Sequence, residues 1–426
     1  MAAAAALWRA GEPVICVDSG DPPGLEVLRE EGIEVETTSD GLEALERARA
    51  VVKSPGVPAQ APVIAAARER GIPVLGELEL GWRLLPNPFV AVTGTNGKTT
   101  TVELLGEIWR AAGLPVAVAG NVGTAVTSLP GRLDPAATVI CEASSFQLED
   151  SLAFDPEVAV FLNFSPDHLD RHGTVGDYLE AKLRLFSHQD ADDFAVGPAE
   201  LLSQAGGEAA RVTVARPPEG EGEVRVADGW ITWNGDPVVE ASAVRLRGRH
   251  NLDNALCAAG AALAWGVPVE AVARALTGFA GVEHRIEEVG SAAGATWVND
   301  SKATNAGSTT VALEAFDEPV LLIAGGQAKG QDFGQLAQAA QGRVRQAFLL
   351  GQDAELLAAA LEPGTPCLRF DDLDGAVGAA AQAATEGDVV LLSPACASFD
   401  LYPGGYEERG AHFRALVAGI PGFSAG

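Results

Sequence analysis

The sequence predicts an α/β protein made of mostly parallel sheets flanked by helices. Short apolar runs that end in Gly, Ser, Asn or Asp alternate with Ala- and Leu-rich stretches along nearly the whole chain, which is the pattern of parallel strands covered by helices. The 426 residues exceed one ordinary core, because a typical domain holds about 150. We therefore expect three α/β domains, at residues 1–77, 78–282 and 283–426.

Each expected domain has its own series of strands. The first, a small Rossmann-like unit, opens with the helical stretch Met1–Ala10 and continues with Val14–Val17, Ile33–Glu36, Ala50–Lys53 and Pro73–Leu75. The central domain runs through Phe89–Thr93, Val116–Ala119, Thr138–Cys141, Val158–Leu162 and Phe194–Val196, then a hairpin at Gly229–Gly235 and a helix at Asn251–Trp265. The third, again Rossmann-like, has Thr296–Asn299, Val320–Ala324, Ala347–Leu350 and Val389–Leu392.

Composition excludes several classes of function. The net charge of −29 at pH 7 repels nucleic acids and anionic membranes, and no apolar run approaches the roughly 20 residues of a membrane span. The five cysteines are scattered and form no CxxC pair, which indicates a reducing cytoplasm. If the substrates are anionic, local lysines, arginines, helix N-termini or metal ions must attract them. We expect a cytoplasmic monomer with small-molecule substrates, no nucleic-acid partner and no membrane insertion.

The central domain begins with a candidate phosphate loop. The strand Phe89–Thr93 runs into Gly94, Thr95, Asn96, Gly97, Lys98, Thr99 and Thr100, and a helical stretch follows. Loop amides and the helix N-terminus can cradle phosphate oxygens, with Lys98 on the β and γ phosphates of ATP and the Thr99 hydroxyl on Mg²⁺. Val92 stands where the strict P-loop motif has glycine, and a Gly-rich turn without function is the alternative interpretation.

Three further residues lie near the ends of neighbouring predicted strands or on the following helix. Glu142 ends a strand, His168 lies in a polar loop, and Lys182 has apolar residues at helical spacing around it. An acid and an imidazole beside a phosphate loop suit a second divalent metal ion. Taken singly, Glu142 could be a helix cap, His168 a surface residue and Lys182 a lysine with a buried stem and an exposed charge.

The third domain offers a polar segment after its first strand. Arg285 precedes this strand, and its planar guanidinium suits an ATP phosphate. Asp300 follows the strand and suits the ribose hydroxyls. Lys302 and Lys329 remain for the charge of the substrate.

These motifs together resemble the Mur ligases, which add amino acids to UDP-N-acetylmuramic acid. The string Thr93–Thr100 is similar to their phosphate loop, and folylpolyglutamate synthetase has a similar one. The resemblance implies an ATP- and Mg²⁺-dependent ligase with two metal ions and a P-loop ATPase-like central domain. It also implies that Lys182 is carbamylated and, like Thr99, Glu142 and His168, ligates metal. Asn121 and Ser144 would contact the muramoyl substrate, and Asn251 and Asn254 the ATP.

The last part of the chain resembles the D-glutamate-adding branch of that family. The segment Leu392–Asp400, followed by Arg409 and Gly410, carries this resemblance. It implies an enzyme that joins D-glutamate to UDP-N-acetylmuramoyl-L-alanine through an acyl phosphate. The implied contacts to the amino acid and substrate are Lys302, Thr304, Lys329, Ser398, Phe399 and Tyr406. Cys396 is interpreted as a buried thiol and not as a nucleophile.

The start of the chain departs from the family pattern. Asp18 and the turn Ser54, Pro55 and Gly56 resemble the uridine-contacting residues, but Gly20 replaces an expected basic residue. The usual first strand and G-x-G-x-[ST]-G turn are not found before Met1–Ala10. A misplaced start codon or a change in nucleotide recognition would explain this, and we expect the 426-residue chain to bind the UDP substrate weakly. The alternatives for function are a sister amide ligase and a nucleotide-binding regulatory module without catalysis.

Overall fold

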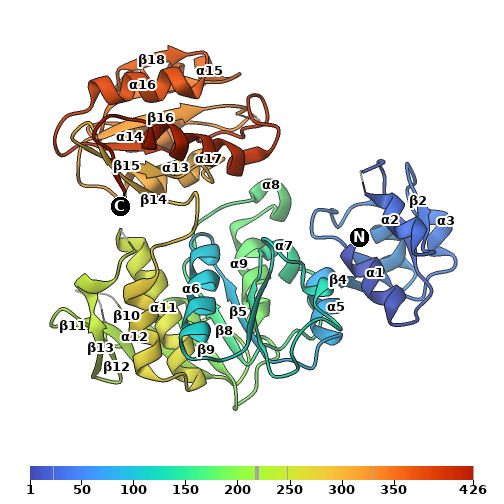
Figure 1. Cartoon of the computed structure of the whole chain (residues 1–426). Coiled ribbons are helices and arrows are strands. Elements are labelled where there is room, and N and C mark those ends of the chain that lie inside the picture. The colour runs from blue at the N-terminus through green and yellow to red at the C-terminus, as the bar shows by residue number, and fades with distance from the viewer. Residues whose placement is uncertain (23, 216–219, 247, 329, 426) are drawn as a thin grey trace. The chain divides into compact units, whose positions relative to one another are not determined.

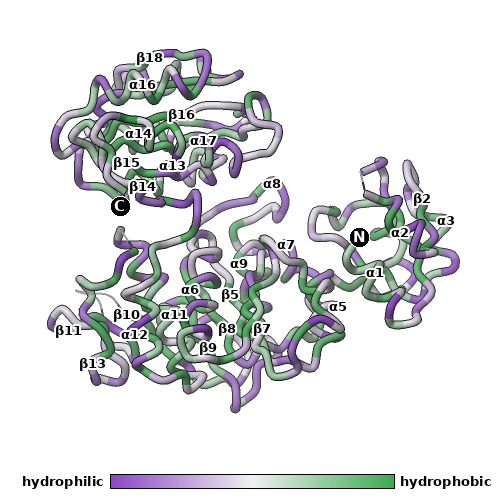
Figure 2. Tube along the Cα trace, viewed as in Figure 1, coloured by the Kyte–Doolittle hydropathy of each residue, from purple (hydrophilic) through white to green (hydrophobic). Residues whose placement is uncertain are grey.

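The computed structural model describes residues 1–22, 24–215, 220–246, 248–328 and 330–425 (Figure 1). They form two compact units. Unit 1 consists of Met1–Val244 and Asn251–Phe279, and unit 2 of Arg245–His250 and Ala280–Gly426. Apolar residues concentrate on the strands and inner helix faces of both units, and polar residues on the loops (Figure 2). The predicted α/β class is confirmed, because large and mostly parallel sheets lie between helices.

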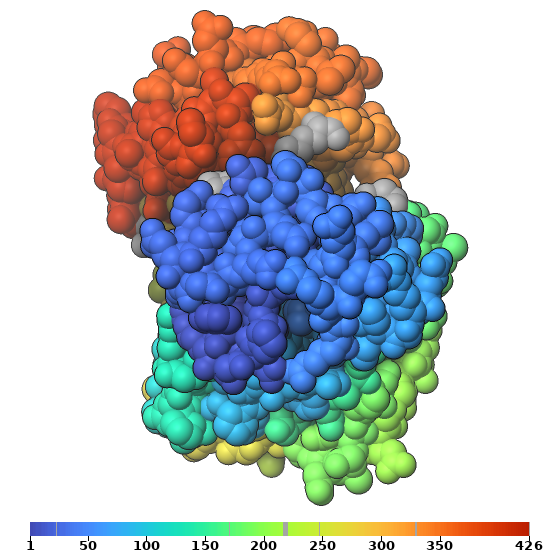
Figure 3. All heavy atoms as spheres, turned by 90° about the vertical axis from the view of Figure 1, so that its right-hand side faces the viewer, coloured from blue at the N-terminus to red at the C-terminus, as the bar shows by residue number. Residues whose placement is uncertain are grey.

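The N-terminal region of unit 1 contains short parallel strand pairs and helices. Its elements are α1 (Ala2–Arg9), β1 (Ile15–Val17), α2 (Leu25–Glu30), β2 (Glu34–Glu36), α3 (Leu42–Leu45), β3 (Val51–Lys53), α4 (Pro62–Glu69), β4 (Val74–Gly76) and α5 (Glu77–Arg83). β1 pairs with β2 and β3 with β4, as two separate sheets. All four predicted strands and the opening helix are therefore confirmed. Figure 3 shows the outer face of this region, with a hollow beside the dark blue start of the chain.

The rest of unit 1 is built on a nine-stranded sheet. Its strands are β5 (Phe89–Thr93), β6 (Val116–Gly120), β7 (Thr138–Glu142), β8 (Val158–Phe161), β9 (Phe194–Gly197), β10 (Ala210–Ala215), β11 (Val224–Ala227), β12 (Trp230–Trp233) and β13 (Asp236–Glu240), in the spatial order β13-β12-β11-β10-β9-β8-β5-β7-β6. The seven strands from β11 to β6 in this spatial order pair in parallel, whereas β12 pairs antiparallel with both β11 and β13. The phosphate-loop strand β5 thus lies inside the sheet, between β7 and β8.

Helices cover both faces of this sheet. One group is α6 (Lys98–Ala111), α11 (Arg249–Trp265) and α12 (Val269–Gly278), and Trp109 of α6 packs on Trp265 with ring centroids 6.0 Å apart. The other face carries a core that includes Phe89, Phe161 and Phe186. Connecting elements are η1 (Val126–Ser128), α7 (Ser145–Leu148), α8 (Leu169–His172), α9 (Val175–Leu183), η2 (Arg184–Phe186), α10 (Ala199–Leu202) and η3 (Ala241–Ala243).

Unit 2 is a seven-stranded sheet between two helical layers. Its elements are β14 (Glu287–Ala292), β15 (Ala295–Asn299), α13 (Ala306–Leu313), β16 (Val320–Gly325), α14 (Gly334–Ala340), β17 (Val344–Leu350), α15 (Ala354–Leu361), β18 (Cys367–Phe370), α16 (Leu373–Ala383), β19 (Val389–Leu392), α17 (Gly405–Ala418) and β20 (Ser424–Ala425). The strand order is β18-β17-β16-β19-β15-β14-β20, parallel from β18 to β15. One core packs under α13, α14 and α15, and the other under α16 and α17.

Candidate active site

The phosphate loop connects β5 to α6, as the sequence predicts. Gly97 caps α6 with a φ of 85°, a conformation that favours glycine. A Cβ on Gly97 would lie 2.2 Å from Oδ1 of the buried Asn254 on α11, and Asn254 donates to Asn251 Oδ1 at 3.1 Å. The predicted Asn251 and Asn254 are therefore brought to the phosphate loop by the packing of α11 on α6.

Two lysines share one carbonyl of this loop. Lys98 Nζ donates to the carbonyl oxygens of Gly94 and Thr95, at 2.9 Å each. Lys182 Nζ, on α9, donates to the same Gly94 oxygen at 2.7 Å and lies 4.6 Å from the centroid of the Tyr178 ring. The two ammonium groups thus lie at the same end of β5, although they are far apart in the chain.

Lys182 is almost completely buried, with 1% of its surface exposed. Burial, aided by the nearby positive charge of Lys98, lowers the pKa of Lys182 from 10.5 to about 6. The amine is therefore largely neutral at neutral pH, which is the form that reacts with CO₂ to give a carbamate. The interpretation of Lys182 as a buried stem with an exposed charge is wrong, because the Nζ atom itself lies inside the protein.

The loop is held from the side by residues that follow β8. Asn163 accepts a hydrogen bond from the amide of Asn96 at 2.9 Å and donates to its carbonyl at 3.1 Å. The Thr95 hydroxyl donates to the Ser165 carbonyl at 3.1 Å and lies 3.3 Å from the Tyr178 hydroxyl. These contacts hold the loop against the segment that follows β8 and against Tyr178 on α9.

Glu142 ends β7 beside the phosphate-loop strand and is 3% exposed. Its Oε1 accepts from Asn121 Nδ2 at 3.0 Å, and among the residues that the structure describes, its Oε2 has no hydrogen-bond partner. A buried carboxylate oxygen without a partner is costly unless a cation or proton satisfies it. Glu142 therefore fits the role of a Mg²⁺ ligand, and Asn121 orients its carboxylate.

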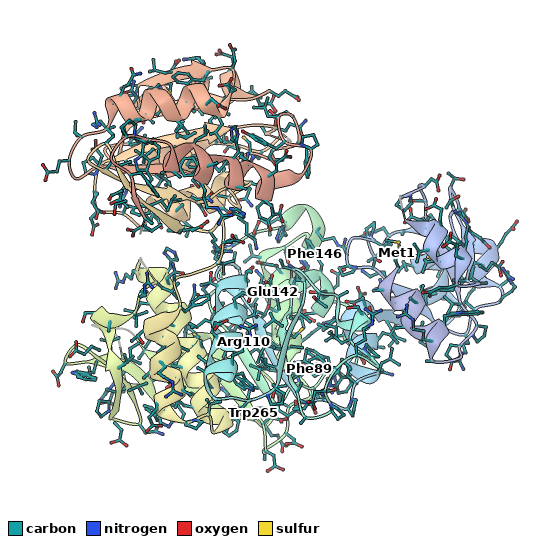
Figure 4. All side chains as sticks on the ribbon, in the orientation of Figure 1. Met1, Phe89, Arg110, Glu142, Phe146 and Trp265 are labelled. Atoms are coloured by element: carbon teal, nitrogen blue, oxygen red, sulfur yellow. The ribbon has the colours of Figure 1, made fainter. Side chains whose placement is uncertain are left out.

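His168 lies near this site on the loop before α8. It has a φ of 51°, a side chain about half exposed at 46%, and a ring 4.9 Å from that of Phe146 on α7. Figure 4 shows Glu142 and Phe146 toward one end of the strands and Phe89 toward the other. Ser144 caps α7 through a reciprocal capping box with Gln147, so its hydroxyl already has a structural role.

The donor set at this end of the sheet fits hard cations. Carboxylate, hydroxyl and, after carbamylation, carbamate oxygens are the ligands that Mg²⁺ prefers, and Thr99 is buried at the first turn of α6. Within the described part of the chain no cluster of three or more His, Cys, Asp or Glu side chains is poised to hold a metal ion. A bound ion would therefore depend on the Glu142 carboxylate, the Thr99 hydroxyl, a Lys182 carbamate, water and nucleotide oxygens.

The residues that resemble uridine contacts lie in the N-terminal region of unit 1. Asp18 follows β1 and accepts from the amide of Gly20 at 2.8 Å. Ser54 and Gly56 are exposed on a turn after β3, closed by a 3.0 Å hydrogen bond from Val57 N to Ser54 O. Asp18 and this turn belong to different two-stranded sheets of the region.

In unit 2, Arg285 lies in a strained segment next to Asp300. His284 and Ile286, on either side of Arg285, have φ angles of 62° and 44°, and a positive φ at a β-branched residue is unusual. Asp300, 4% exposed, accepts from Ile286 N at 3.2 Å and from the Ser393 hydroxyl at 2.7 Å. Burial raises the pKa of Asp300 to about 7, although the Ser393 hydrogen bond and Arg285 oppose this. The buried Asp300 side chain thus stabilises the strained segment by accepting the hydrogen bond from Ile286 N.

The other residues expected to hold the amino acid lie on three neighbouring segments of unit 2. Lys302 Nζ is 5.7 Å from the centroid of the Tyr406 ring, and Ser301 donates to the Tyr406 carbonyl at 2.8 Å. Thr304 follows on the Lys302 segment. Ser398 is buried beside a small pocket that Tyr402 and Arg409 also line, and Phe399 is 58% exposed. Lys329 lies outside the described residues.

Comparison with known proteins identifies the family. The chain is 41% identical, over 97% of its own length and 94% of the relative's, to the UDP-N-acetylmuramoylalanine–D-glutamate ligase of Pelotomaculum thermopropionicum. The chain belongs to the Mur ligase family. It is also 39% identical over its full length to the protein of that name from Acidobacterium capsulatum, of which the match covers 95%.

Family models match three successive parts of this Mur ligase. Residues 2–76 match the MurD-like N-terminal domain, residues 92–262 the Mur ligase middle domain, and residues 284–396 the Mur ligase glutamate ligase domain. Among solved structures, the UDP-N-acetylmuramate–alanine ligase of Thermotoga maritima has a TM-score of 0.60 at 20% identity, covering 97% of this chain and 95% of that one. E. coli FolC has a TM-score of 0.57 at 18% identity, covering 86% and 99%. At such identities the likeness shows the fold alone.

Three residues that organise this Mur ligase site were not among those predicted from the sequence. Asn163 brackets the phosphate loop, Tyr178 lies between Thr95 and Lys182, and Arg171 connects the His168 segment to the turn after β3. Asn163 could have been found, because it comes directly after an apolar strand, where ligand-binding residues gather in parallel sheets. Tyr178 could have been found as the aromatic one helical turn before Lys182. Arg171 gave no such signal, since its partners come from distant segments.

Proposed function

We propose that this chain joins D-glutamate to UDP-N-acetylmuramoyl-L-alanine in an ATP-dependent reaction that supplies precursors of peptidoglycan. The observation that carries the proposal is near-full-length identity of about 40% to several relatives that bear the name of this ligase. The fold alone does not choose among the family's activities, because the alanine ligase and FolC share it. The reaction class is a ligase that forms an amide and converts ATP to ADP and phosphate.

In unit 1, the loop amides and Lys98 would hold the phosphates of ATP, because they lie at the N-terminus of α6. The hydroxyl of Thr99, the free oxygen of Glu142, His168 and a carbamylated Lys182 would hold two Mg²⁺ ions. These ions would neutralise charge as the γ-phosphoryl group moves onto the substrate carboxylate. Asn121 orients Glu142, and Asn163 holds the phosphate loop through the backbone of Asn96.

In unit 2, Arg285 and Asp300 would contact ATP, and Lys302, Thr304, Lys329, Ser398, Phe399 and Tyr406 would contact D-glutamate. Lys302 Nζ lies 5.7 Å from the centroid of the Tyr406 ring, and its ammonium would meet a carboxylate of the amino acid beside that ring. The amine of D-glutamate then attacks the acyl phosphate, the tetrahedral intermediate collapses, and phosphate leaves as the amide forms. Positioning of the two reactants and neutralisation of charge would supply the rate increase.

Asp18, Ser54, Gly56, Asn121 and Ser144 would bind the UDP-muramoyl substrate. We further propose that the enzyme acts in the cytoplasm as a monomer. Its five cysteines are all free, as expected of a protein that works in a reducing compartment. No helix among the described residues is long and apolar enough to cross a membrane.

The deciding experiment measures phosphate release from ATP in the presence of UDP-N-acetylmuramoyl-L-alanine, with and without D-glutamate. We expect sustained release only when both substrates are present, together with the amide product by mass spectrometry. Replacing D-glutamate by L-alanine or a diamino acid tests the sister-ligase alternative, and activity with those amino acids alone would refute the assignment. ATP binding without any substrate-dependent phosphate release would favour a regulatory module.

A further inference from the structure

Two cationic side chains, Lys53 and Arg171, donate hydrogen bonds to backbone carbonyls of the turn Ser54–Val57. Ser54 and Gly56 are exposed, and a Cβ on Gly56 would meet nothing within 4 Å. On the inner side, the Val57 carbonyl accepts from Lys53 Nζ at 3.0 Å and from Arg171 Nη2 at 3.1 Å. Arg171 Nη2 also donates to the Pro55 carbonyl at 3.2 Å. The turn therefore keeps one face open to a ligand while its carbonyls are fixed inside.

These cations belong to a buried ion network that joins the N-terminal region to α7. The Lys53 ammonium, whose side chain has 0% exposure, pairs with Glu149 at 3.0 Å and Asp150 at 2.5 Å. Arg171 pairs with the same Glu149 oxygen. Breaking such a pair leaves a buried charge uncompensated, so the network locks the turn, the end of α7 and Arg171 in one arrangement.

Arg171 also lies on the single helical turn that begins at His168. The amides of Arg171 and His172 donate to the His168 carbonyl at 3.1 and 3.0 Å. The Arg171 guanidinium carbon lies 5.0 Å from the centroid of the Phe146 ring, and the His168 ring 4.9 Å from the same ring. Phe146 thus contacts both Arg171, which hydrogen-bonds to the turn, and His168, the candidate metal ligand.

We propose that Arg171 is a positioning residue that couples the turn Ser54–Val57 to His168. Binding of the uridine diphosphate part of the substrate at the turn would thereby hold α8, and with it the His168 imidazole, in the working position. The inference rests on the proposed function in assigning the uridine nucleotide to this turn. It goes beyond that function by stating that substrate binding in the N-terminal region prepares the metal site beside the phosphate loop.

The kinetic test compares Arg171→Gln with Arg68→Gln. Arg68 is half exposed at 50% and lies 3.6 Å from Asp150, so its removal takes a cation from the same network without touching the turn. We expect Arg171→Gln to raise both the KM for UDP-N-acetylmuramoyl-L-alanine and the Mg²⁺ concentration for half-maximal rate about tenfold, as loss of charged hydrogen bonds implies. Arg68→Gln should change both less than twofold. Arg171→Lys should show smaller increases than Arg171→Gln, because lysine keeps the positive charge but lacks the planar guanidinium with its several donors.

A double substitution distinguishes coupling from general loosening of the structure. Ser54→Ala should raise the KM for the UDP substrate and also the Mg²⁺ requirement in the wild type, but only the KM when Arg171 is glutamine. If Arg171→Gln raises the KM alone, or if the effects of the two substitutions on the Mg²⁺ requirement simply add, the turn and His168 are independent and the proposal fails.

Hydrogen exchange with UDP as the probe gives a readout without catalysis. UDP should slow exchange of the amides of α8 in the full-length wild-type chain but not in Arg171→Gln. If UDP protects only amides of Ser54–Val57 and none of α8, the proposed coupling is refuted. The proposed ligase function is not affected by that result. Absence of any UDP protection near the turn would also overturn the coupling, and ligase activity in the phosphate-release assay would then show that the proposed function still holds.

Discussion

Gly97→Ala tests whether the phosphate loop depends on the contact between α6 and α11. An alanine at a φ of 85° is strained by about 1–2 kcal/mol, and its Cβ would lie 2.2 Å from Asn254 Oδ1. Relieving that clash moves a buried side chain and adds about 1–3 kcal/mol. We therefore expect unfolding free energy to fall by about 2–5 kcal/mol and the KM for ATP to rise at least about tenfold, because the loop amides shift.

Gly113→Ala is the matched control for this substitution. Gly113 lies just beyond α6 with a φ of 71° and nothing within 4 Å of the added Cβ, so it carries the strain without the clash. The assays are the midpoint of thermal unfolding and the KM for ATP. Adding Asn254→Ala to Gly97→Ala should restore part of the lost stability. Equal losses of stability in Gly97→Ala and Gly113→Ala, with an unchanged KM for ATP, would refute the reasoning.

Three other outcomes follow from the buried charges of the two units. Glu142→Gln should lower kcat at least about a hundredfold. The unfolding midpoint should not fall, because the substitution removes an unsatisfied charge at the buried Oε2. An unchanged apparent affinity for Mg²⁺ in this variant would contradict the ligand role. Burial raises the pKa of Asp300 to about 7, so wild-type stability falls as pH rises from about 4 through 7, and Asp300→Asn should gain stability over the wild type at pH 8 but not at pH 4 in chemical unfolding. Burial lowers the pKa of Lys182 to about 6, so wild-type stability rises with pH between about 6 and 10. The stability that Lys182→Met gains over the wild type should therefore be larger at pH 6 than at pH 9. An equal gain at both pH values would show that the pKa of Lys182 is not lowered in the folded protein.

The sequence predicted the fold where strands are continuous and apolar. β5, β7 and β8 are fully buried on both faces, so they read as uninterrupted apolar runs bounded by polar turns. β12 was found because the aromatic and β-branched residues Trp230–Trp233 are followed by an Asn-Gly pair. β11 escaped prediction because its mostly half-exposed residues, Arg225 among them, break the apolar run. β13 escaped because it lies at the edge of the sheet and is exposed at both ends.

Of the site, the sequence predicted the ends of strands but not the contacts between them. Lys98 and Glu142 could be placed at one edge of the sheet, because parallel strands bring their carboxyl ends together. That Lys182 donates to Gly94, or that Asn254 packs on Gly97, depends on how α9 and α11 pack, which no local pattern encodes. The ion network around Lys53 and Arg171 is of the same kind, since its members come from three separate segments.

A carbamylated Lys182 would let a strongly acidic chain bind anionic substrates and metal cations at the same edge of the sheet. Two ammonium groups on the single Gly94 carbonyl repel each other, and burial makes Lys182 the one that gives up its proton, since its pKa is about 6. The neutral amine could then add CO₂ and lose one proton to water, and the resulting carbamate would be an anion that Lys98 attracts. The same change would supply oxygen ligands at the edge of the sheet where Glu142 has a buried oxygen without a hydrogen-bond partner among the described residues. Under the proposed function, this one modification would leave Lys98 as the cation for phosphate and make Lys182 a ligand for metal.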